Sequence, residues 1–260
     1  MFLLTASWRS GSTLLQRLIM SDPAVMLWGE PFAHCGYIER LAGSMSAFTA
    51  AWPPDFFFLG HRPEDENLEE SWIANLYPEP FAVLAAHRAF FETLFARPAQ
   101  AAGYRRWGFK EVRVDIDQAA YLRWLFPDAR IVLVVRNPYA AWRSYRLWRN
   151  WYQRWPDDPV LTPKRFGEVW SRLAEGFATR FEEVGGAFFR YEEFTGDGRD
   201  AALQRLAGHV SVEIDAGVLE HRVRGPFHQK LEPIPAPERL RLHRAVRRVA
   251  EDLGYEPGDY

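Results

Sequence analysis

Short apolar runs alternate with helical segments along most of this 260-residue chain. The run Arg-Ile-Val-Leu-Val-Val at residues 130–135 is nearly unbroken, which is typical of a central strand in a parallel sheet. An alternation of this kind favours βαβ units, so we predict an α/β fold with a parallel sheet of about five strands, helices on both faces, and one domain over residues 1–260. The predicted strands cover residues 2–5, 25–28, 107–109, 130–135 and 187–191.

The segments between these runs predict helices. One begins near Ser12, and another follows Asn137-Pro138, where asparagine provides an N-cap and proline the first helical residue. We expect this second helix to continue to about Trp151. Residues 37–58 have only a partly helical pattern, and residues 61–70 are acidic, as in a surface loop. Further helices are expected at about 81–97, 117–126, 163–184 and 237–253.

The composition excludes several classes of protein. The 32 basic and 34 acidic side chains leave a net charge of -2, so no global field attracts nucleic acid or an anionic membrane. Cys35 is the only cysteine, which excludes an internal disulfide framework and cysteine-only metal sites. No apolar run reaches the roughly 18 residues of a membrane span, and the first residues do not resemble a signal peptide. We therefore expect a cytoplasmic protein with no membrane span and no nucleic-acid partner.

A loop of small and polar residues joins the first predicted strand to the first helix, and it reads Thr-Ala-Ser-Trp-Arg-Ser-Gly-Ser-Thr over residues 5–13. Such a loop directs several backbone N–H groups to one place, and the helix dipole adds to the attraction of an anion. Arg9, Ser12 and Thr13 add side-chain donors. We predict an anion site here, with an ordinary polar strand-to-helix loop as the alternative.

This loop does not match the nucleoside-triphosphate loop Gly-x-x-x-x-Gly-Lys-Ser/Thr. With its second glycine aligned on Gly11, Ala6 replaces the first glycine and Ser12 replaces the lysine. The strand at 130–135 is followed by Arg136 rather than by a carboxylate that could hold magnesium. These departures argue against a small-molecule kinase, and we expect no metal.

A second anion site is predicted at Arg136, which follows the central strand where ligands bind in open α/β sheets. Ser144 lies about two turns into the next helix, close enough to share one small anion. Together with the loop at residues 9–13, this gives two separated anion sites at one sheet edge. A nucleotide with phosphates on both its 5′ and 3′ sides fits that arrangement.

These residues resemble the motifs of sulfotransferases that use 3′-phosphoadenosine 5′-phosphosulfate (PAPS). Arg136 with Ser144 looks like their 3′-phosphate motif, and Tyr191 in Arg-Tyr-Glu-Glu-Phe looks like a family tyrosine that lies near the adenine. The resemblance runs from residue 2 to about 195, and it implies PAPS as co-substrate and its bisphosphate product, PAP. The segment similar to the 5′-phosphosulfate loop is Arg9-Ser10-Gly11-Ser12-Thr13-Leu14.

With arginine at position 9, the loop resembles the carbohydrate, tyrosyl-protein and bacterial branches of this family, which have arginine there, whereas the phenol branch has lysine. The phenol branch also has a catalytic histidine after a lysine on its third strand. Here the corresponding stretch reads Phe-Lys-Glu-Val-Arg over residues 109–113, without that histidine.

The resemblance implies that Glu30 is the general base, because a glutamate at this place is the base in tyrosyl-protein and several carbohydrate sulfotransferases. Glu30 closes the second predicted strand, two residues after Trp28, at the same sheet edge as the loop. Glu111 is the alternative base, and Lys110 is expected to have a functional role beside it. His34 is more simply structural, and Lys230 lies in a basic loop whose role is open.

We therefore expect sulfuryl transfer from PAPS to an acceptor hydroxyl on a small molecule, a carbohydrate or a peptide. In this assignment Glu30 takes the acceptor proton, Arg9 stabilises the leaving phosphate, and Arg136 with Ser144 anchors the 3′-phosphate. The alternatives are a small-molecule kinase and a non-catalytic module that binds a nucleotide or nucleic acid. The acceptor and the oligomeric state do not follow from the sequence.

Overall fold

The structure is a computed structural model that describes residues 1–30, 35–147, 159–221 and 231–257. Its centre is a five-stranded sheet with the order β2-β3-β1-β4-β5, in which all paired strands are parallel. The predicted α/β class is therefore confirmed. The strands are β1 (Phe2–Thr5), β2 (Val25–Trp28), β3 (Arg106–Val112), β4 (Ile131–Val135) and β5 (Gly186–Arg190).

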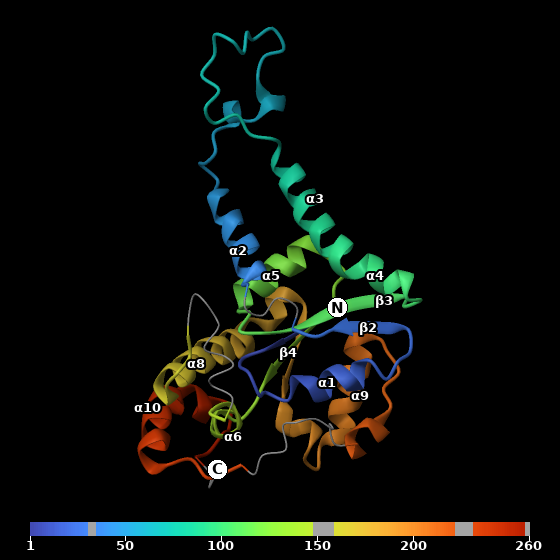
Figure 1. The fold of residues 1–260 in the computed structure, drawn as a ribbon, viewed down its shortest axis with the longest axis vertical. Helices are drawn as coiled ribbons and strands as arrows, with labels where there is room; N and C mark the ends of the chain where they lie inside the picture. The colour runs from blue at the N-terminus through green and yellow to red at the C-terminus, as the bar shows by residue number, and fades with distance from the viewer. Residues whose placement is uncertain (31–34, 148–158, 222–230, 258–260) are drawn as a thin grey trace.

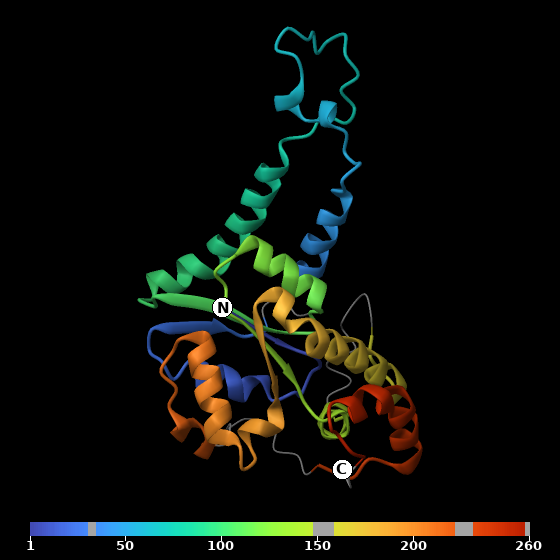
Figure 2. The ribbon, with the colours of Figure 1, turned by 180° about the vertical axis from the view of Figure 1, so that it is seen from behind.

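Helices cover both faces of this sheet (Figures 1 and 2). Because successive side chains of a strand point to opposite faces, β4 contributes Ile131, Leu133 and Val135 to one apolar cluster and its other two valines to a second. α1 (Ser12–Ile19) and α9 (Arg199–Val210) pack on the second cluster. The first cluster is covered by α3 (Pro80–Phe91), α5 (Ile116–Leu125), α6 (Pro138–Tyr145), α8 (Pro163–Arg180) and α10 (Ala236–Asp252).

Several boundaries differ from the sequence-based expectation, and three of them lie near the candidate site. β3 continues to Val112, three residues past the predicted end at 109. The prediction stopped there because Lys110 and Glu111 are polar, but both side chains are buried. α6 ends at Tyr145, and residues 146 and 147 are not helical, so the helix does not continue through them as expected. The rest of the expected continuation, to Trp151, lies outside the described residues. β5 ends at Arg190, and Tyr191 begins a short 3-10 helix, Tyr191–Phe194.

Residues 45–79 form an arm that projects from the body between α2 (Tyr37–Ser44) and α3 (Figures 1 and 2). The acidic segment predicted as a surface loop, residues 61–70, lies within this arm. α4 (Arg97–Ala101) then leads the chain back to β3. In the described ranges, no helix has both the length and the apolar character that a membrane span requires.

Candidate active site

The loop after β1 presents a row of unused backbone donors. In the described part of the chain, the N–H groups of residues 9–13 donate to no carbonyl and no side chain, while the N–H of Ala6 is bonded to Val134 (3.0 Å). Gly11 takes the left-handed conformation (φ 83°) directly before α1. The side chain of Ser10 is fully buried, and its Oγ has no hydrogen-bond partner among the described residues. Buried polar groups are normally hydrogen-bonded, so the loop is suited to an anion that accepts from it.

Aromatic contacts hold this loop in place. The indole of Trp8 is buried and stacks on the ring of Tyr145 in α6, with 5.2 Å between the ring centroids. The guanidinium of Arg113, just past β3, lies 4.9 Å from the centre of the Trp8 ring. Arg9 has a positive φ of 61°, a conformation that is rare for a residue with a side chain and is concentrated at functional sites. Trp8 is thus a structural part of the site that sequence reasoning missed, although it lies inside the predicted loop.

Tyr191 lies between the loop and Arg136. A Cβ on Gly11 would stand only 2.0 Å from Cδ2 of the Tyr191 ring, so the ring packs directly against the glycine backbone. The guanidinium of Arg136 lies over the Tyr191 ring, 4.5 Å from its centroid. Burial lowers the pKa of Arg136, while the facing Tyr191 and Glu192 act in the opposite direction. A buried cation of this kind gains stability from a bound anion.

The two predicted anion sites are contiguous. Nε of Arg9 donates to Oγ of Ser144 (2.8 Å), and Nη1 of Arg136 donates to the backbone carbonyl of Arg9 (2.8 Å). Nε of Arg136 has no hydrogen-bond partner among the described residues. The structure thus brings the residues of the two predicted sites together through Arg9, and their binding of anions stays a prediction.

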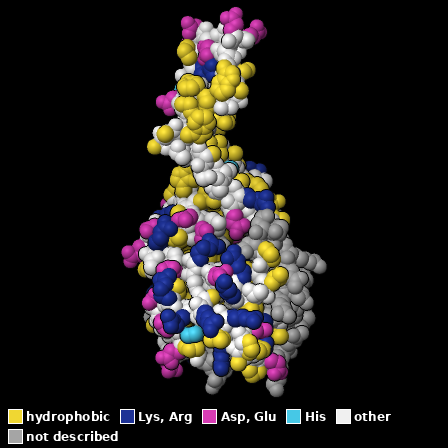
Figure 3. Space-filling view, turned by 90° about the vertical axis from the view of Figure 1, so that its left-hand side faces the viewer, with side chains coloured by type: hydrophobic (Ala, Val, Ile, Leu, Met, Phe, Trp, Pro, Cys, Tyr) yellow, Lys and Arg dark blue, Asp and Glu magenta, His cyan; other side chains and the backbone are white. Residues whose placement is uncertain are grey.

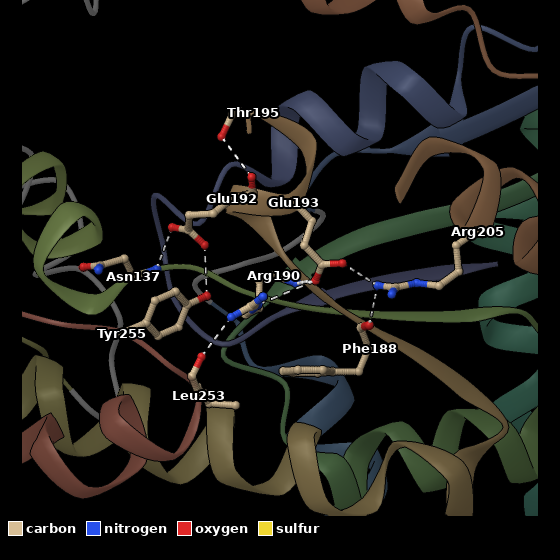
Figure 4. Close-up of polar contacts among 9 residues, drawn as sticks. All are labelled: Asn137, Phe188, Arg190, Glu192, Glu193, Thr195, Arg205, Leu253 and Tyr255. Atoms are coloured by element: carbon tan, nitrogen blue, oxygen red, sulfur yellow. Dashed lines mark hydrogen bonds and ion pairs between the residues drawn. The ribbon is translucent and has the colours of Figure 1, made fainter. Parts of the chain in front are cut away.

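Glu192 supports the turn that carries Arg136. One carboxylate oxygen accepts from the backbone N–H of Asn137 (2.9 Å), and the other accepts from the hydroxyl of Tyr255 (2.9 Å), as Figure 4 shows. The Asn137 side chain accepts from the N–H groups of Tyr139 and Ala140, which caps α6 as predicted. Glu192 therefore connects the C-terminal segment to the helix of Ser144. In the sequence, Glu192 could be noticed because it follows Tyr191 in Arg-Tyr-Glu-Glu-Phe, whereas nothing marked Tyr255.

Glu30, Lys110 and Ser12 come together at the same edge. The register of β2 against β3 pairs Trp28 with Phe109, which brings the residues that follow them into contact. Nζ of Lys110 donates to Oε1 of Glu30 (2.5 Å) and to Oγ of Ser12 (3.4 Å). The Lys110 side chain is 6% exposed and that of Glu30 is 29% exposed. The lysine thus connects a solvent-accessible carboxylate to the first turn of α1.

Glu111 has a different environment. It is buried, Oε2 accepts from the N–H of Val112 (3.1 Å), and Oε1 has no partner among the described residues. Burial raises the pKa of Glu111 well above its usual range, and the nearby Glu30 carboxylate raises it further. Glu111 is therefore less accessible to an acceptor hydroxyl than the partly exposed Glu30.

The remaining predicted residues are less closely involved. The N–H of Leu14 donates to the carbonyl of Gly11 (2.9 Å), and its side chain packs with the apolar cluster under α1, so this N–H is not among the unused donors, and the predicted role of Leu14 stays a prediction. The Thr13 side chain is exposed at the start of the helix. His34 and Lys230 lie outside the described residues. Nowhere in the described ranges do three or more His, Cys, Asp or Glu side chains form a group that could hold a metal ion.

A loop of free N–H groups, two arginines and a lysine–glutamate pair at one sheet edge can bind a dianionic ligand beside a proton acceptor. A model of the sulfotransferase family matches residues 2–215. The chain belongs to the sulfotransferase family. The match spans all five strands and both predicted anion sites of this sulfotransferase.

Solved structures share the fold of this sulfotransferase. It is similar to the sulfotransferase domain from the curacin biosynthetic pathway, with a TM-score of 0.56, 15% identity and 98% of each chain covered. It is also similar to the sulfotransferase domain of the Synechococcus PCC 7002 olefin synthase, with a TM-score of 0.52 and 16% identity over 98% of this chain and 94% of that one. No curated protein matches the chain in sequence.

Gly11 gives a first testable prediction. We expect Gly11→Ala to lower the free energy of unfolding by about 1–2 kcal/mol, the usual cost of a left-handed residue with a side chain. The new Cβ also displaces the Tyr191 ring, which faces Arg136, so affinity for the PAP that the resemblance implies should fall. Denaturant unfolding and calorimetry measure the two effects.

Gly208→Ala is the matched control for this substitution. Gly208 lies in α9, where an added Cβ meets nothing within 4 Å, so alanine should be neutral or stabilise the helix by about 0.5–1 kcal/mol. Equal PAP affinity in Gly11→Ala and wild type would show that the contact between Gly11 and Tyr191 is not part of the nucleotide site.

Proposed function

We propose that this sulfotransferase transfers the sulfuryl group of PAPS to an acceptor hydroxyl, with Glu30 as general base. The observation that carries the proposal is the joint position of Arg9, which reaches Ser144, and of Glu30, which is held by Lys110 at the same sheet edge. The direct test is an acceptor screen with labelled PAPS, read by the mass of the sulfated product.

The donor nucleotide is supported by the unused groups of the site. The free N–H groups of residues 9–13 and the unpartnered Oγ of Ser10 fit the 5′-phosphosulfate. Arg136, with one guanidinium nitrogen unpartnered, and Ser144 fit the 3′-phosphate. Tyr191, next to both groups, fits one side of the adenosine. Bound PAPS supplies an activated sulfuryl group, and the protein supplies position and charge.

The residues then have distinct roles in this proposal. Glu30, which is partly exposed, takes the proton of the acceptor hydroxyl as its oxygen bonds to sulfur. Arg9 and the loop N–H groups stabilise the negative charge that grows on the leaving phosphate oxygen. Lys110 orients the Glu30 carboxylate and adds positive charge next to Ser12. The expectation that the reaction needs no metal stays a prediction.

The 3′-phosphate assignment predicts a preference among nucleotides. We expect the protein to bind PAP much more tightly than adenosine 5′-phosphate. Arg136→Ala should weaken PAP about 10- to 100-fold, because one charge-assisted hydrogen bond contributes roughly 1.5–3 kcal/mol. Its effect on adenosine 5′-phosphate, which lacks the 3′ group, should be much smaller. Isothermal calorimetry of both nucleotides with both proteins gives the comparison, and equal affinities of the wild type for PAP and adenosine 5′-phosphate would exclude this 3′ site.

A further inference from the structure

The arm, residues 45–79, exposes an unusual amount of apolar surface. Thirteen large hydrophobic side chains are exposed in the described part of the chain, and seven of them belong to the arm. Trp72 is 64% exposed and Phe56 is 59% exposed. Soluble monomers rarely expose contiguous apolar patches of this kind unless another molecule covers them. The seven side chains are Trp52, Phe56, Leu59, Leu68, Trp72, Ile73 and Tyr77.

The arm has an internal structure that presents these side chains. Phe57 is 5% exposed and forms its centre, with ring-centroid distances of 5.2 Å to Trp52, 5.8 Å to Trp72 and 6.0 Å to Tyr77. Backbone bonds join the two sides of the arm, since the N–H of Tyr77 donates to Phe57 (2.8 Å) and the N–H of Leu59 to Tyr77 (3.2 Å). The exposed aromatic rings therefore form a defined surface.

The arm is also strongly acidic. Residues 45–79 contain seven Asp and Glu residues and one basic residue, Arg62, which gives a net charge of -6 within a chain of net charge -2. The rest of the chain therefore carries a net charge of +4. Arg62 is paired with Glu66. Five exposed carboxylates of the arm have no ion-pair partner among the described residues: Asp55, Glu64, Asp65, Glu69 and Glu70.

A complementary surface lies on α8 and α10. A hollow of about 390 Å³, the basic hollow, is lined by Lys164, Glu168, Arg241, Arg244 and Ala245. Within the described ranges, Arg241 and Arg244 pair with no carboxylate, although both are exposed. Figure 3 shows Lys and Arg side chains gathered on the body below an arm that is apolar with an acidic tip.

We propose that the arm binds the basic hollow of a second copy of this chain. The arm lies at one end of the molecule and α10 at the other, so the arm cannot reach the hollow of its own chain (Figures 1 and 2). Two antiparallel copies place each arm on the other body, which gives a closed two-fold dimer. Apolar side chains of the arm supply the buried area, and its carboxylates pair with Arg241 and Arg244 of the facing copy.

Charge reversal on the 260-residue chain tests this dimer by sedimentation equilibrium. We expect wild type to dimerise, and salt to weaken the dimer because exposed charges are screened. The arm variant Glu69→Arg with Glu70→Arg and the hollow variant Arg241→Glu with Arg244→Glu should each raise the dimer Kd at least about 30-fold, since like charges then face each other. An equimolar mixture of the two variants should form a heterodimer of near wild-type affinity, because both of its contacts are again between opposite charges.

A control pair has the same charge change at a different place. Glu182→Arg with Glu220→Arg alters two exposed carboxylates outside the arm that have no ion pair among the described residues, and it should leave the dimer Kd unchanged. A wild type that stays monomeric up to about 100 μM, well above the Kd of standard-size interfaces, overturns the proposal and directs the arm to another partner. A mixture of the two reversed variants that remains monomeric overturns it as well.

Discussion

Glu30→Gln is expected to lower kcat for sulfuryl transfer by about 10²- to 10⁴-fold, the usual contribution of a general base. Glutamine keeps the size of the side chain and an oxygen that can accept from Lys110, so the hydrogen bond at 2.5 Å has a replacement. It cannot take the proton of the acceptor hydroxyl. PAP affinity should change little, because Glu30 faces the acceptor in the proposed arrangement. Steady-state kinetics on one acceptor and calorimetry with PAP measure the two quantities.

Glu111→Gln is the matched control for that experiment. Burial already favours the neutral form of Glu111, so its amide should be a close replacement and the loss in kcat should be much smaller. If Glu30→Gln keeps kcat within about threefold of wild type while Glu111→Gln loses the activity expected of a missing base, the two carboxylates have the opposite roles.

Arg9→Ala is expected to lower kcat by at least about 10²-fold, the scale of losing one donor to a developing oxyanion. Arg9 contacts Ser144 through Nε and lies at the start of the free N–H groups, where the leaving phosphate oxygen is proposed to be. An interaction that strengthens as charge grows lowers the barrier, whereas equal binding of substrate and transition state does not. PAP affinity should therefore fall by a smaller factor than kcat. Single-turnover kinetics and PAP calorimetry separate the two effects.

Arg17→Ala controls for the loss of an arginine near the loop, since Arg17 lies in the last turn of α1. Its guanidinium donates to the backbone carbonyls of His221 (2.9 Å) and Val218 (3.4 Å), near the far end of the helix, so kcat should remain near wild type. An Arg9→Ala protein with normal kcat and only a raised KM for PAPS would mean that Arg9 contributes uniform binding.

Much of the fold followed from the sequence because the signals are local. The apolar runs at β1, β2 and β4 predicted their strands within a residue, since a buried parallel strand needs a short continuous apolar segment. The end of β3 was missed because Lys110 and Glu111 are polar residues in a strand that serves the site. The arm had no periodic pattern to predict it, because its rings pack around Phe57 instead of along a helix or strand face.

The sequence by itself determined the loop after β1, the Arg136 turn and the strand that ends before Glu30, because strands, caps and turns depend on residues close together in the chain. Only the tertiary structure decided which of these side chains meet. Arg9 contacts Ser144 across 135 residues, and Lys110 contacts Glu30 across 80. Those contacts depend on strand order and register, which no local window of sequence contains, and the same holds for the pairing of Glu192 with Tyr255.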